Sequence, residues 1–346
     1  MTKHKVGVVG GTGYTGAELV RLLVNHPDVI LETVTSRSEA GRSFSAVHPH
    51  FSGLADMKFQ TVEKLDRYDL DLVFLALPHG ASMDFIESYK EEKYRVIDLS
   101  GDFRLTSAKT YEKWYGQDHT APEFIDKAVF GLPELFRDEV RTANLVANPG
   151  CYPTSAILAL APLLKNNLIK TEGITIDAKS GVTGAGATAS AKTHFPDVFG
   201  NFSAYGLRTH RHTPEIQQAL QRYINGDEPQ VLFTPHLLPI DRGILSTTYS
   251  TPRKSLNEEL IQETVARFYE KERFVRVLDE PPKVKNVRGS NYCDLFVTYD
   301  NRTNKIITIS TIDNLVKGAA GQAVQNMNIM FGLIEHSGLK ITPLSP

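Results

Sequence analysis

A glycine-rich segment near the start of the chain, GVVGGTGYTGAELV, constrains the fold more than any other stretch. It joins an apolar, strand-like run to an amphipathic, helix-like run. Gly10, Gly13 and Gly16 lie at the junction, where missing side chains allow a tight turn and a close approach to a pyrophosphate, whose charge a helix N-terminus stabilises. The spacing is G-x-x-G-x-x-G rather than G-x-G-x-x-G, and a purely structural turn is the alternative. The strand and helix on either side favour a dinucleotide-binding site.

Strand-like and helix-like segments alternate over the first 150 residues. Apolar, strand-like runs occur at residues 5–10, 30–35, 70–78 and 94–101. This alternation predicts βαβ units and a parallel sheet. From residue 173 strand-like runs dominate, with one long helix candidate at 255–273 and a last helix at about 318–337. The second part is therefore predicted to be an α+β domain with a mixed, largely antiparallel sheet.

Length and composition indicate the class of protein. A chain of 346 residues exceeds what one hydrophobic core usually supports, so two domains are expected. The apolar fraction of 41%, the charged fraction of 23% and the net charge of -2 are typical of a soluble globular protein, with neither nucleic acid nor membrane as its main partner. We find no secretory signal and no apolar window long enough to span a membrane. Two cysteines make a disulfide framework improbable and predict a reducing, cytoplasmic setting.

The end of the second strand-like run, TVTSRSEAGR, bears on the choice of dinucleotide. An NAD site usually carries an acidic residue there for the ribose 2'-hydroxyl, whereas this chain has Ser36, Arg37 and Ser38. A guanidinium and two hydroxyls suit a 2'-phosphate, so the sequence favours NADP. A solvated Arg37 is the alternative, and Glu39, just beyond, is the residue that argues against NADP.

The segment ANLVANPGCYPTSAILAL places Cys151 in a turn between a strand-like and a helix-like run. A thiol just before a helix has a lowered pKa, because the positive end of the helix dipole stabilises the nucleophilic thiolate. A small filler at a turn is the alternative interpretation. The second cysteine, Cys293, alternates with other residues of a strand-like run and is interpreted as inert packing.

A nucleophilic thiol needs an acid/base partner, and LRTHRHTPEIQQAL offers His210 and His212. We expect both to precede a helix capped by Thr213, with Pro214 at the first helical position. In an extended approach, residues two apart point the same way, so one imidazole could transfer protons and the other bind or orient substrate. Structural histidines and a metal half-site are alternatives. No cysteine or carboxylate at metal-ligand spacing supports the metal, and none is expected.

Six motifs together resemble the N-acetyl-gamma-glutamyl-phosphate reductase family of arginine biosynthesis, which is related to aspartate-semialdehyde dehydrogenase. They are GGTGYTGAELVRLL, VIDLSGDFRL, NPGCYPT, KSGVTGAG, HRHTPEI and DNLVKGAAGQAVQNMN, and the resemblance extends over essentially the whole chain. It implies an NADPH-dependent acylating semialdehyde dehydrogenase that reduces N-acetyl-L-glutamyl 5-phosphate to the semialdehyde and phosphate through a cysteine thioester.

The resemblance also implies roles for individual residues. Cys151 is the nucleophile, His212 is favoured over His210 as general acid/base, and Arg104 is matched to the substrate phosphate. Further substrate contacts are expected from Asn148, Ser180, Gly181, His210 and Glu215. Cofactor contacts are expected from Gly10, Gly11, Thr12, Gly13, Tyr14, Thr15, Gly16, Ser36, Arg37 and Ser38, and near the nicotinamide from Asn314 and Lys317.

The expected architecture is an α/β chain with two domains. A Rossmann-type NADP-binding domain spans residues 1–147 and is completed by residues 314–346, which return to it and thereby bring Cys151 and the nicotinamide into one cleft. Residues 148–313 form the catalytic and oligomerisation domain, whose sheet is the expected contact in a homodimer or homotetramer. Two alternatives remain: reduction of another acyl phosphate, aspartyl or N-acetyl-aminoadipyl, and a non-catalytic NADP-sensing regulator. The expected mark of a regulator is loss of the cysteine or the histidines, and both are present.

Overall fold

The computed structural model describes residues 3–88, 93–226 and 228–345, which form two compact units. The first unit comprises the chain up to Glu112, Gly116–Pro149 and Ala319–Ile341, and the second comprises Gly150–Gly318 with two short segments, Lys113–Tyr115 and the residues from Thr342 onward. The return to the first unit thus begins at residue 319 rather than 314, and Asn314 and Lys317 lie in the second unit.

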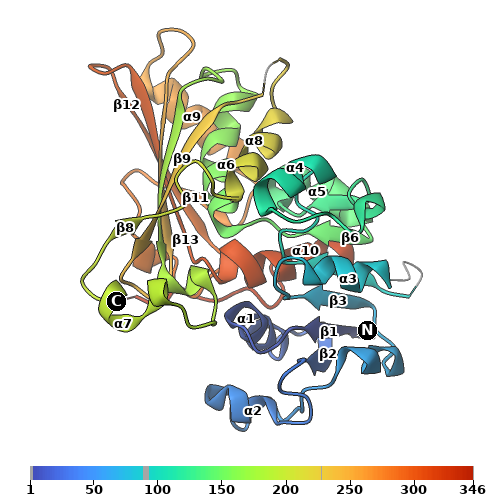
Figure 1. Ribbon diagram of the computed structural model, residues 1–346. Coiled ribbons are helices and arrows are strands. Elements are labelled where there is room, and N and C mark those ends of the chain that lie inside the picture. The colour runs from blue at the N-terminus through green and yellow to red at the C-terminus, as the bar shows by residue number, and fades with distance from the viewer. Residues whose placement is uncertain (1–2, 89–92, 227, 346) are drawn as a thin grey trace. The chain divides into compact units, whose positions relative to one another are not determined.

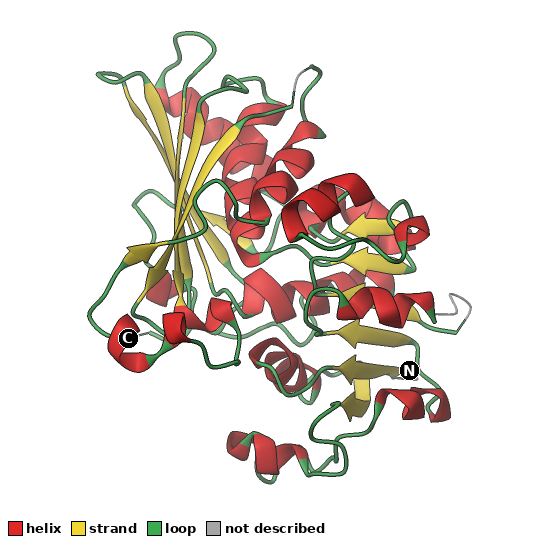
Figure 2. Ribbon diagram, viewed as in Figure 1, coloured by secondary structure: helices red, strands yellow, loops and turns green. Residues whose placement is uncertain are grey.

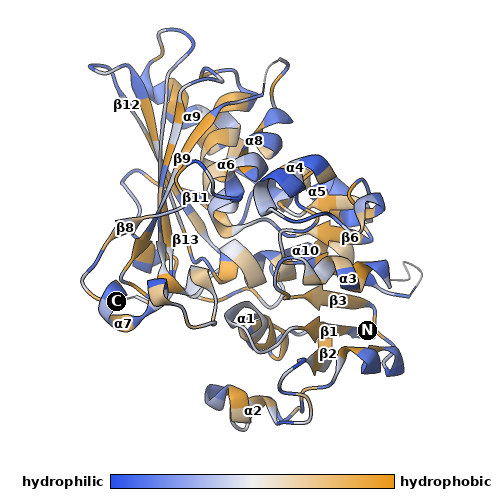
Figure 3. Cartoon of the chain, viewed as in Figure 1, coloured by the Kyte–Doolittle hydropathy of each residue, from blue (hydrophilic) through white to orange (hydrophobic). Residues whose placement is uncertain are grey.

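The first unit is built on a six-stranded parallel sheet with the strand order β2-β1-β3-β4-β6-β5 (Figure 1). Most residues of its strands are apolar (Figure 3), because both faces of a parallel sheet are largely covered. The order reverses between β1 and β3, and such a switch point is where open α/β sheets bind their ligands. The strands are β1 (His4–Val9), β2 (Val29–Thr35), β3 (Leu72–Leu75), β4 (Arg95–Asp98), β5 (Ala128–Phe130) and β6 (Leu145–Ala147).

Helices connect these strands, as the alternating sequence pattern predicts. The last helix, α10, packs on α1, α5 and β4 of this unit. The helices are α1 (Tyr14–Leu23), α2 (Phe44–Val47), α3 (Ala81–Glu87), α4 (Ala108–Tyr115), α5 (Pro133–Thr142) and α10 (Gly321–Met330), with short 3₁₀ turns at Pro49–Phe51, Val62–Arg67 and Pro122–Phe124.

The second unit contains a seven-stranded mixed sheet with the order β11-β12-β13-β10-β7-β9-β8. The pairs β11/β12 and β7/β9 are parallel and the other four are antiparallel, which confirms the predicted mixed, largely antiparallel sheet. The strands are β7 (Ile174–Gly181), β8 (Ser203–Ala204), β9 (Val231–Leu238), β10 (Ile244–Ser250), β11 (Val275–Val277), β12 (Cys293–Asp300) and β13 (Lys305–Ile312).

Three helices cover one face of this sheet: α6 (Cys151–Lys165), α8 (His212–Gln221) and α9 (Glu258–Tyr269) (Figure 2). The thirteen residues after Cys151 are buried without interruption, and the Ser155 hydroxyl lies 2.7 Å from those of Ser246 in β10 and Ser310 in β13. Shorter pieces are α7 (Phe195–Val198), a π-helix η7 (Val316–Ala320) and 3₁₀ turns at Val182–Ala185, Ala191–Thr193 and Val284–Asn286. None of the helices in the described part of the chain has the length and apolar character needed to cross a membrane.

Candidate active site

The glycine loop after β1 has the geometry that a dinucleotide site requires. Gly10 has φ +93°, and a Cβ there would lie 2.4 Å from the Ala76 carbonyl oxygen beyond β3. A Cβ on Gly16 would lie 2.3 Å from the Gly10 carbonyl oxygen, so α1 can pack on the loop only through a glycine. Gly13 has no atom within 4 Å of a built Cβ. Since protein packing does not require this glycine, its open surface fits the approach of a pyrophosphate.

The first turn of α1 supports the same interpretation. Gly13 is the N-cap residue and supplies no side-chain cap, and the turn contains no acidic residue. Its N–H groups, beginning at Tyr14 and Thr15, are therefore suited to bind an anion, with the positive end of the helix dipole behind them. The residues present fit a dinucleotide phosphate.

Two charged residues of the loop after β2, Arg37 and Glu39, lie in different environments. The Ser36 hydroxyl accepts a hydrogen bond from the backbone N–H of Glu39 at 3.1 Å, and the Glu39 carboxylate pairs with Arg42. Arg37 and Ser38 are exposed, and the described residues give the Arg37 guanidinium no hydrogen bond or ion pair. Glu39 is therefore engaged by a neighbour, whereas Arg37 is available to a ligand.

His48 also contacts the glycine loop, and the sequence analysis missed it. Its Nε2 lies 3.0 Å from the Gly11 carbonyl oxygen, so Nε2 carries the proton and donates. Burial lowers the pKa of His48, which favours the neutral ring. His48 and His50 in SAVHPHF belong to no motif that the sequence analysis uses, so no sequence signal points to this contact.

Cys151 is the first residue of α6 rather than a residue before it. Gly150 is the N-cap, with an extended backbone, and the side chain of Cys151 is partly exposed. A thiolate at this position lies at the positive end of the α6 dipole. Cys293, by contrast, is fully buried in β12.

A buried hydrogen bond joins α8 to the start of α6. The Gly150 N–H donates to the Glu215 carboxylate at 2.7 Å, and Glu215 is fully buried in the first turn of α8. His212 begins the same helix three residues earlier and shares its face with Glu215. The bond thus fixes the helix that carries His212 against the residue that precedes Cys151.

The two histidines are adjacent, but not through an extended segment. Arg211 has helical dihedral angles and is the N-cap, so α8 begins at His212, and the predicted cap Thr213 and first position Pro214 are wrong. The Thr213 N–H donates to the His210 carbonyl oxygen at 3.0 Å, closing a turn that brings the ring centroids of His210 and His212 to 4.7 Å. The rings meet because the chain turns here.

A hydrogen bond from the His212 backbone determines which ring nitrogen of His210 carries the proton. The His212 backbone N–H donates to Nδ1 of His210 at 3.2 Å, so neutral His210 carries its proton on Nε2. Burial, and less strongly the charge of Arg211, lower the pKa of His210 to about 4. At neutral pH His210 is therefore a hydrogen-bond donor with no ring nitrogen left to accept a proton.

Two tyrosines complete the surroundings of the histidines. The Tyr152 ring meets His210 and His212 edge-on, with centroids 5.7 and 5.9 Å away. The Tyr205 hydroxyl donates to the Tyr152 hydroxyl at 3.1 Å, and that hydroxyl donates to the His236 carbonyl oxygen at 3.0 Å. Burial raises the pKa of both phenols, that of Tyr205 to about 12, so both remain protonated at neutral pH.

The π-helix η7 approaches the cysteine directly. A Cβ on Gly318 would lie 2.7 Å from Cβ and 3.2 Å from Cα of Cys151. The Asp313 carboxylate accepts from the N–H groups of Leu315 and Val316 at 2.8 and 3.1 Å and fixes the entry to η7. Gly318 is a position that the sequence analysis did not single out, and only a glycine fits there without displacing Cys151.

Comparison with known proteins agrees with this geometry. Family models for the NAD binding domain and the dimerisation domain of semialdehyde dehydrogenase match residues 5–143 and 151–314. The N-acetyl-gamma-glutamyl-phosphate reductase of Pelotomaculum thermopropionicum is 51% identical over 99% of both chains, and that of Clostridium novyi is 46% identical over 97% of this chain and 98% of its own. The chain belongs to the N-acetyl-gamma-glutamyl-phosphate reductase family. This confirms the family predicted from the six motifs.

Solved structures share the fold of this reductase-family chain at low identity. Aspartate semialdehyde dehydrogenase II of Vibrio cholerae, complexed with ASA, superposes with a TM-score of 0.73 at 18% identity, covering 96% of this chain and 99% of its own. The aspartate semialdehyde dehydrogenase of Candida albicans with NADP superposes with a TM-score of 0.70 at 16% identity. The match covers 95% of this chain and 99% of that one. The α/β fold with a Rossmann-type and a mixed-sheet domain is confirmed.

The remaining predicted residues of the reductase-family chain have structural partners. In the first unit, Arg104 is 7% exposed and donates to the carbonyl oxygens of Leu99 and Asn148 at 2.7 and 2.8 Å. The Asn148 amide donates to the Ala319 carbonyl oxygen at 3.1 Å and accepts from Asn326 at 3.1 Å. Asn148 therefore ties the end of β6 to the α10 segment, and both polar atoms of its side chain are already engaged.

In the second unit the remaining residues lie where β7 ends. The Ser180 hydroxyl donates to the Gly181 carbonyl oxygen at 3.0 Å, and a Cβ on Gly181 would lie 2.7 Å from the Asp241 carbonyl oxygen. Asn314 accepts from the Gly243 N–H at 2.7 Å and donates to Thr183 Oγ1 at 3.0 Å. Lys317 is fully buried, with its ammonium 5.7 Å from the centroid of the Phe274 ring.

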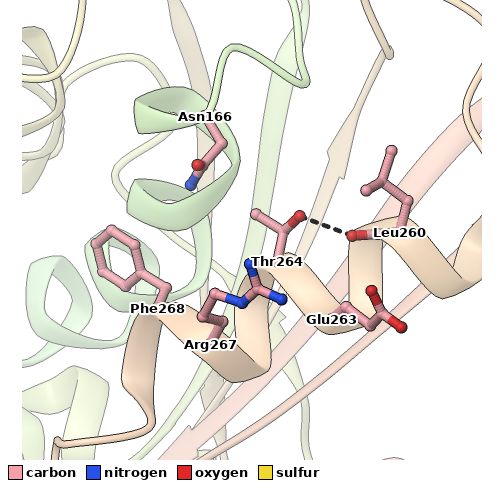
Figure 4. Close-up of a pocket in the computed structure, with 6 residues that line it drawn as sticks. All are labelled: Asn166, Leu260, Glu263, Thr264, Arg267 and Phe268. Atoms are coloured by element: carbon pink, nitrogen blue, oxygen red, sulfur yellow. Dashed lines mark hydrogen bonds between the residues drawn. The ribbon is translucent and has the colours of Figure 1, made fainter.

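A surface pocket of the reductase-family chain lies away from the cysteine, between the C-terminal end of α6 and α9 (Figure 4). Its lining residues include Asn166, Thr264, Arg267 and Phe268. Cys151 begins α6 and Asn166 follows its last residue, so the length of that helix, roughly 20 Å, separates them. The pocket is lined by neither Cys151 nor the two histidines.

Proposed function

We propose that the chain reduces N-acetyl-L-glutamyl 5-phosphate to N-acetyl-L-glutamate 5-semialdehyde and phosphate with NADPH, in arginine biosynthesis. The observation that carries this proposal is Cys151 at the first position of α6, held by the Gly150–Glu215 hydrogen bond against the helix that His212 begins. A sensor that had lost catalysis would not need this arrangement. The full-length relatives named for this activity support the substrate.

In this mechanism the Cys151 thiolate attacks the acyl carbon of the substrate. A carbon–sulfur bond forms, the bond from that carbon to the phosphate oxygen breaks, and inorganic phosphate leaves with the bonding electron pair. The product is a thioester, which accepts hydride far more readily than a carboxylate does. The dipole of α6 stabilises the thiolate before attack and again when the aldehyde is released.

We assign the proton transfers to His212 and a hydrogen-bonding role to His210. After hydride addition the carbonyl oxygen takes a proton from the His212 imidazolium. Collapse of the thiohemiacetal returns that proton to the imidazole, breaks the carbon–sulfur bond and regenerates the thiolate. His210 cannot accept a proton, because Nδ1 is occupied and Nε2 already carries hydrogen. It donates from Nε2 to the substrate oxygen.

NADPH, when bound, supplies the hydride. The glycine loop and the first turn of α1 bind its pyrophosphate, through Gly10–Gly16, and Arg37 with Ser36 and Ser38 binds the 2'-phosphate. The exposed Arg37 and the engaged Glu39 support NADP over NAD. Asn314 and Lys317 are assigned to the nicotinamide end of the site, and Arg104 to the substrate phosphate.

The proposal extends to assembly and setting. The match to a dimerisation domain over residues 151–314 supports a homo-oligomer, dimeric or tetrameric, whose subunits meet through the second unit. We infer that the sheet face opposite α6, α8 and α9 is the contact, since large apolar side chains such as Leu232 and Tyr249 are exposed on its strands. A reducing cytoplasm suits a catalytic free thiol.

The test is a steady-state comparison of semialdehydes in the reverse direction. N-acetylglutamate semialdehyde, aspartate semialdehyde and N-acetyl-aminoadipate semialdehyde are each supplied with NADP or NAD and phosphate. The proposal expects phosphate-dependent NADPH formation with the highest kcat/KM for N-acetylglutamate semialdehyde. A higher kcat/KM for either of the other aldehydes contradicts it.

A further inference from the structure

The backbone immediately before the active-site histidines adopts an unusual conformation at Arg208. Among the described residues, non-glycine positions with positive φ are Asn167, Arg208 and Asn304. Asparagine tolerates the left-handed region, whereas an arginine pays a steric cost there. Arg208, at φ +63°, is thus the unexpected member of the set, and backbone strain of this kind is concentrated at functional sites.

The loop that carries Arg208 is packed against His210. The Tyr205 N–H donates to the Pro235 carbonyl oxygen at 3.1 Å, and the Thr209 N–H donates to the Gly206 carbonyl oxygen at 3.1 Å, which closes a tight turn around Arg208. A Cβ on Gly206 would lie 3.3 Å from Cδ2 of His210. The turn therefore packs against the His210 imidazole, and Arg208 is one of its two central residues.

The guanidinium of Arg208 is available to a ligand. Arg208 is exposed, and the described residues offer it no hydrogen bond or ion pair. Two other basic side chains of this unit have acidic partners: Arg242 lies 3.5 Å from the buried Asp313, and Lys179 lies 3.0 Å from Asp177. Lys317 is fully buried. A strained backbone that presents an uncommitted cation two residues before His210 fits an anionic group of the substrate.

We propose that Arg208 binds the α-carboxylate of the substrate and thereby determines its class, an acyl phosphate with a carboxylate at the far end of its carbon chain. The inference rests on the proposed function. At the reacting end, the dipole of α6 already stabilises negative charge around Cys151. The α-carboxylate needs a separate cation, and the planar fork of a guanidinium matches a carboxylate with two parallel hydrogen bonds.

The reverse reaction separates the two anions, because the semialdehyde and inorganic phosphate are distinct substrates with separate KM values. Arg208→Ala removes the cation. Arg208→Gly also removes it but accommodates the positive φ, so it separates loss of charge from backbone strain. Arg208→Lys keeps the positive charge but lacks the planar guanidinium that can form two parallel hydrogen bonds. Arg302→Ala, in an exposed turn where Arg302 pairs with Asp300, is the control for net charge.

We expect Arg208→Ala and Arg208→Gly to raise the KM for N-acetylglutamate semialdehyde about 10- to 100-fold, the loss of charge-assisted hydrogen bonds, with the KM for phosphate changed less than about twofold. Arg208→Lys should lie between these variants and the wild type, and Arg302→Ala should match the wild type. A raised KM for phosphate alone, or unchanged KM values in both Arg208 variants, overturns the proposal. A wild-type protein that turns over another semialdehyde but not this one refutes the proposed function, and this assignment with it.

Discussion

The Glu215 carboxylate accepts a hydrogen bond from the Gly150 N–H at 2.7 Å, in a fully buried position. This single bond connects the residue before Cys151, the proposed nucleophile, to the helix that begins with His212. It satisfies one of the N-terminal N–H groups of α6 that has no partner within the helix. The positions of the thiol and of the imidazole are therefore coupled through Glu215, which the family resemblance predicts as a substrate contact.

Glu215→Ala tests this coupling. The variant leaves a buried N–H without its acceptor, which should lower the free energy of unfolding by about 1–3 kcal/mol and also reduce kcat. Glu215→Gln retains a carbonyl oxygen at the same place, so its free energy of unfolding and its kcat should both fall less. Urea unfolding and steady-state kinetics on the two variants provide the measurement. Equal losses of kcat in both would mean that the charge, rather than the hydrogen bond, is what matters.

Gly318→Ala tests the approach of η7 to the cysteine. The new Cβ would lie 2.7 Å from Cβ of Cys151, so one of the two residues must move. A displacement of roughly 1 Å in a reacting group costs about 100-fold in rate, and we expect a fall in kcat of about that size. Gly318→Ser should be at least as impaired. NADPH affinity, measured by fluorescence titration, should stay near that of the wild type, and a variant with full kcat contradicts this reading.

The sequence identifies candidate catalytic groups, whose roles stay predictions, and it misplaces part of their local structure. Cys151, His210 and His212 occur in motifs whose residue types are those expected of a nucleophile and its acid/base partners. The helix starts were misplaced, since Thr213 and Pro214 are strong N-terminal signals and the turn at Arg211 overrides them. The role of Gly318 was not predictable, because the glycine reads as an ordinary helix residue until η7 and α6 are brought together.

The backbone conformation at Arg208, in the second unit, is also not predictable from the local sequence. The conformation of Arg208 depends on the turn closed between Gly206 and Thr209, which no local pattern in GLRTH encodes. The mixed sheet, in contrast, was predictable from its run of strand-like segments. The sequence thus indicates which groups are present, whereas long-range packing decides how each group is held.

Arg37→Asp tests the choice of cofactor. The substitution removes a charge-assisted contact to the 2'-phosphate and adds repulsion, so NADPH binding should weaken by about 1.5–3 kcal/mol and NADH binding far less. Titration of each reduced cofactor by fluorescence gives both affinities. Glu39→Gln is the control, because its carboxylate is paired with Arg42 and should not affect selectivity. Equal losses for the two cofactors in Arg37→Asp would contradict the NADP assignment.

His210 predicts a pH dependence of stability. Its pKa is lowered to about 4, so between that value and the unfolded value near 6.5 the unfolded chain binds more protons than the folded chain. Its contribution to stability is therefore present above pH 6.5 and is lost as the pH falls toward 4. Between pH 7 and pH 5 the wild type should lose about 1–2 kcal/mol from this group, and His210→Asn should not. Urea unfolding of both proteins at both pH values measures the difference. The prediction is refuted if the free energy of unfolding falls equally in the wild type and in His210→Asn.

The central claim, a thioester on Cys151, is tested most directly by a single-turnover experiment in the reverse direction. The enzyme is mixed with N-acetylglutamate semialdehyde and NADP in the absence of phosphate. We expect a burst of one NADPH per active site, with the acyl group found by mass spectrometry on the peptide containing NPGCYPT, and release of that group when phosphate is added. Cys151→Ser should give no burst, although it binds NADPH normally. A burst in Cys151→Ser, or an acyl group on Cys293, would contradict the account.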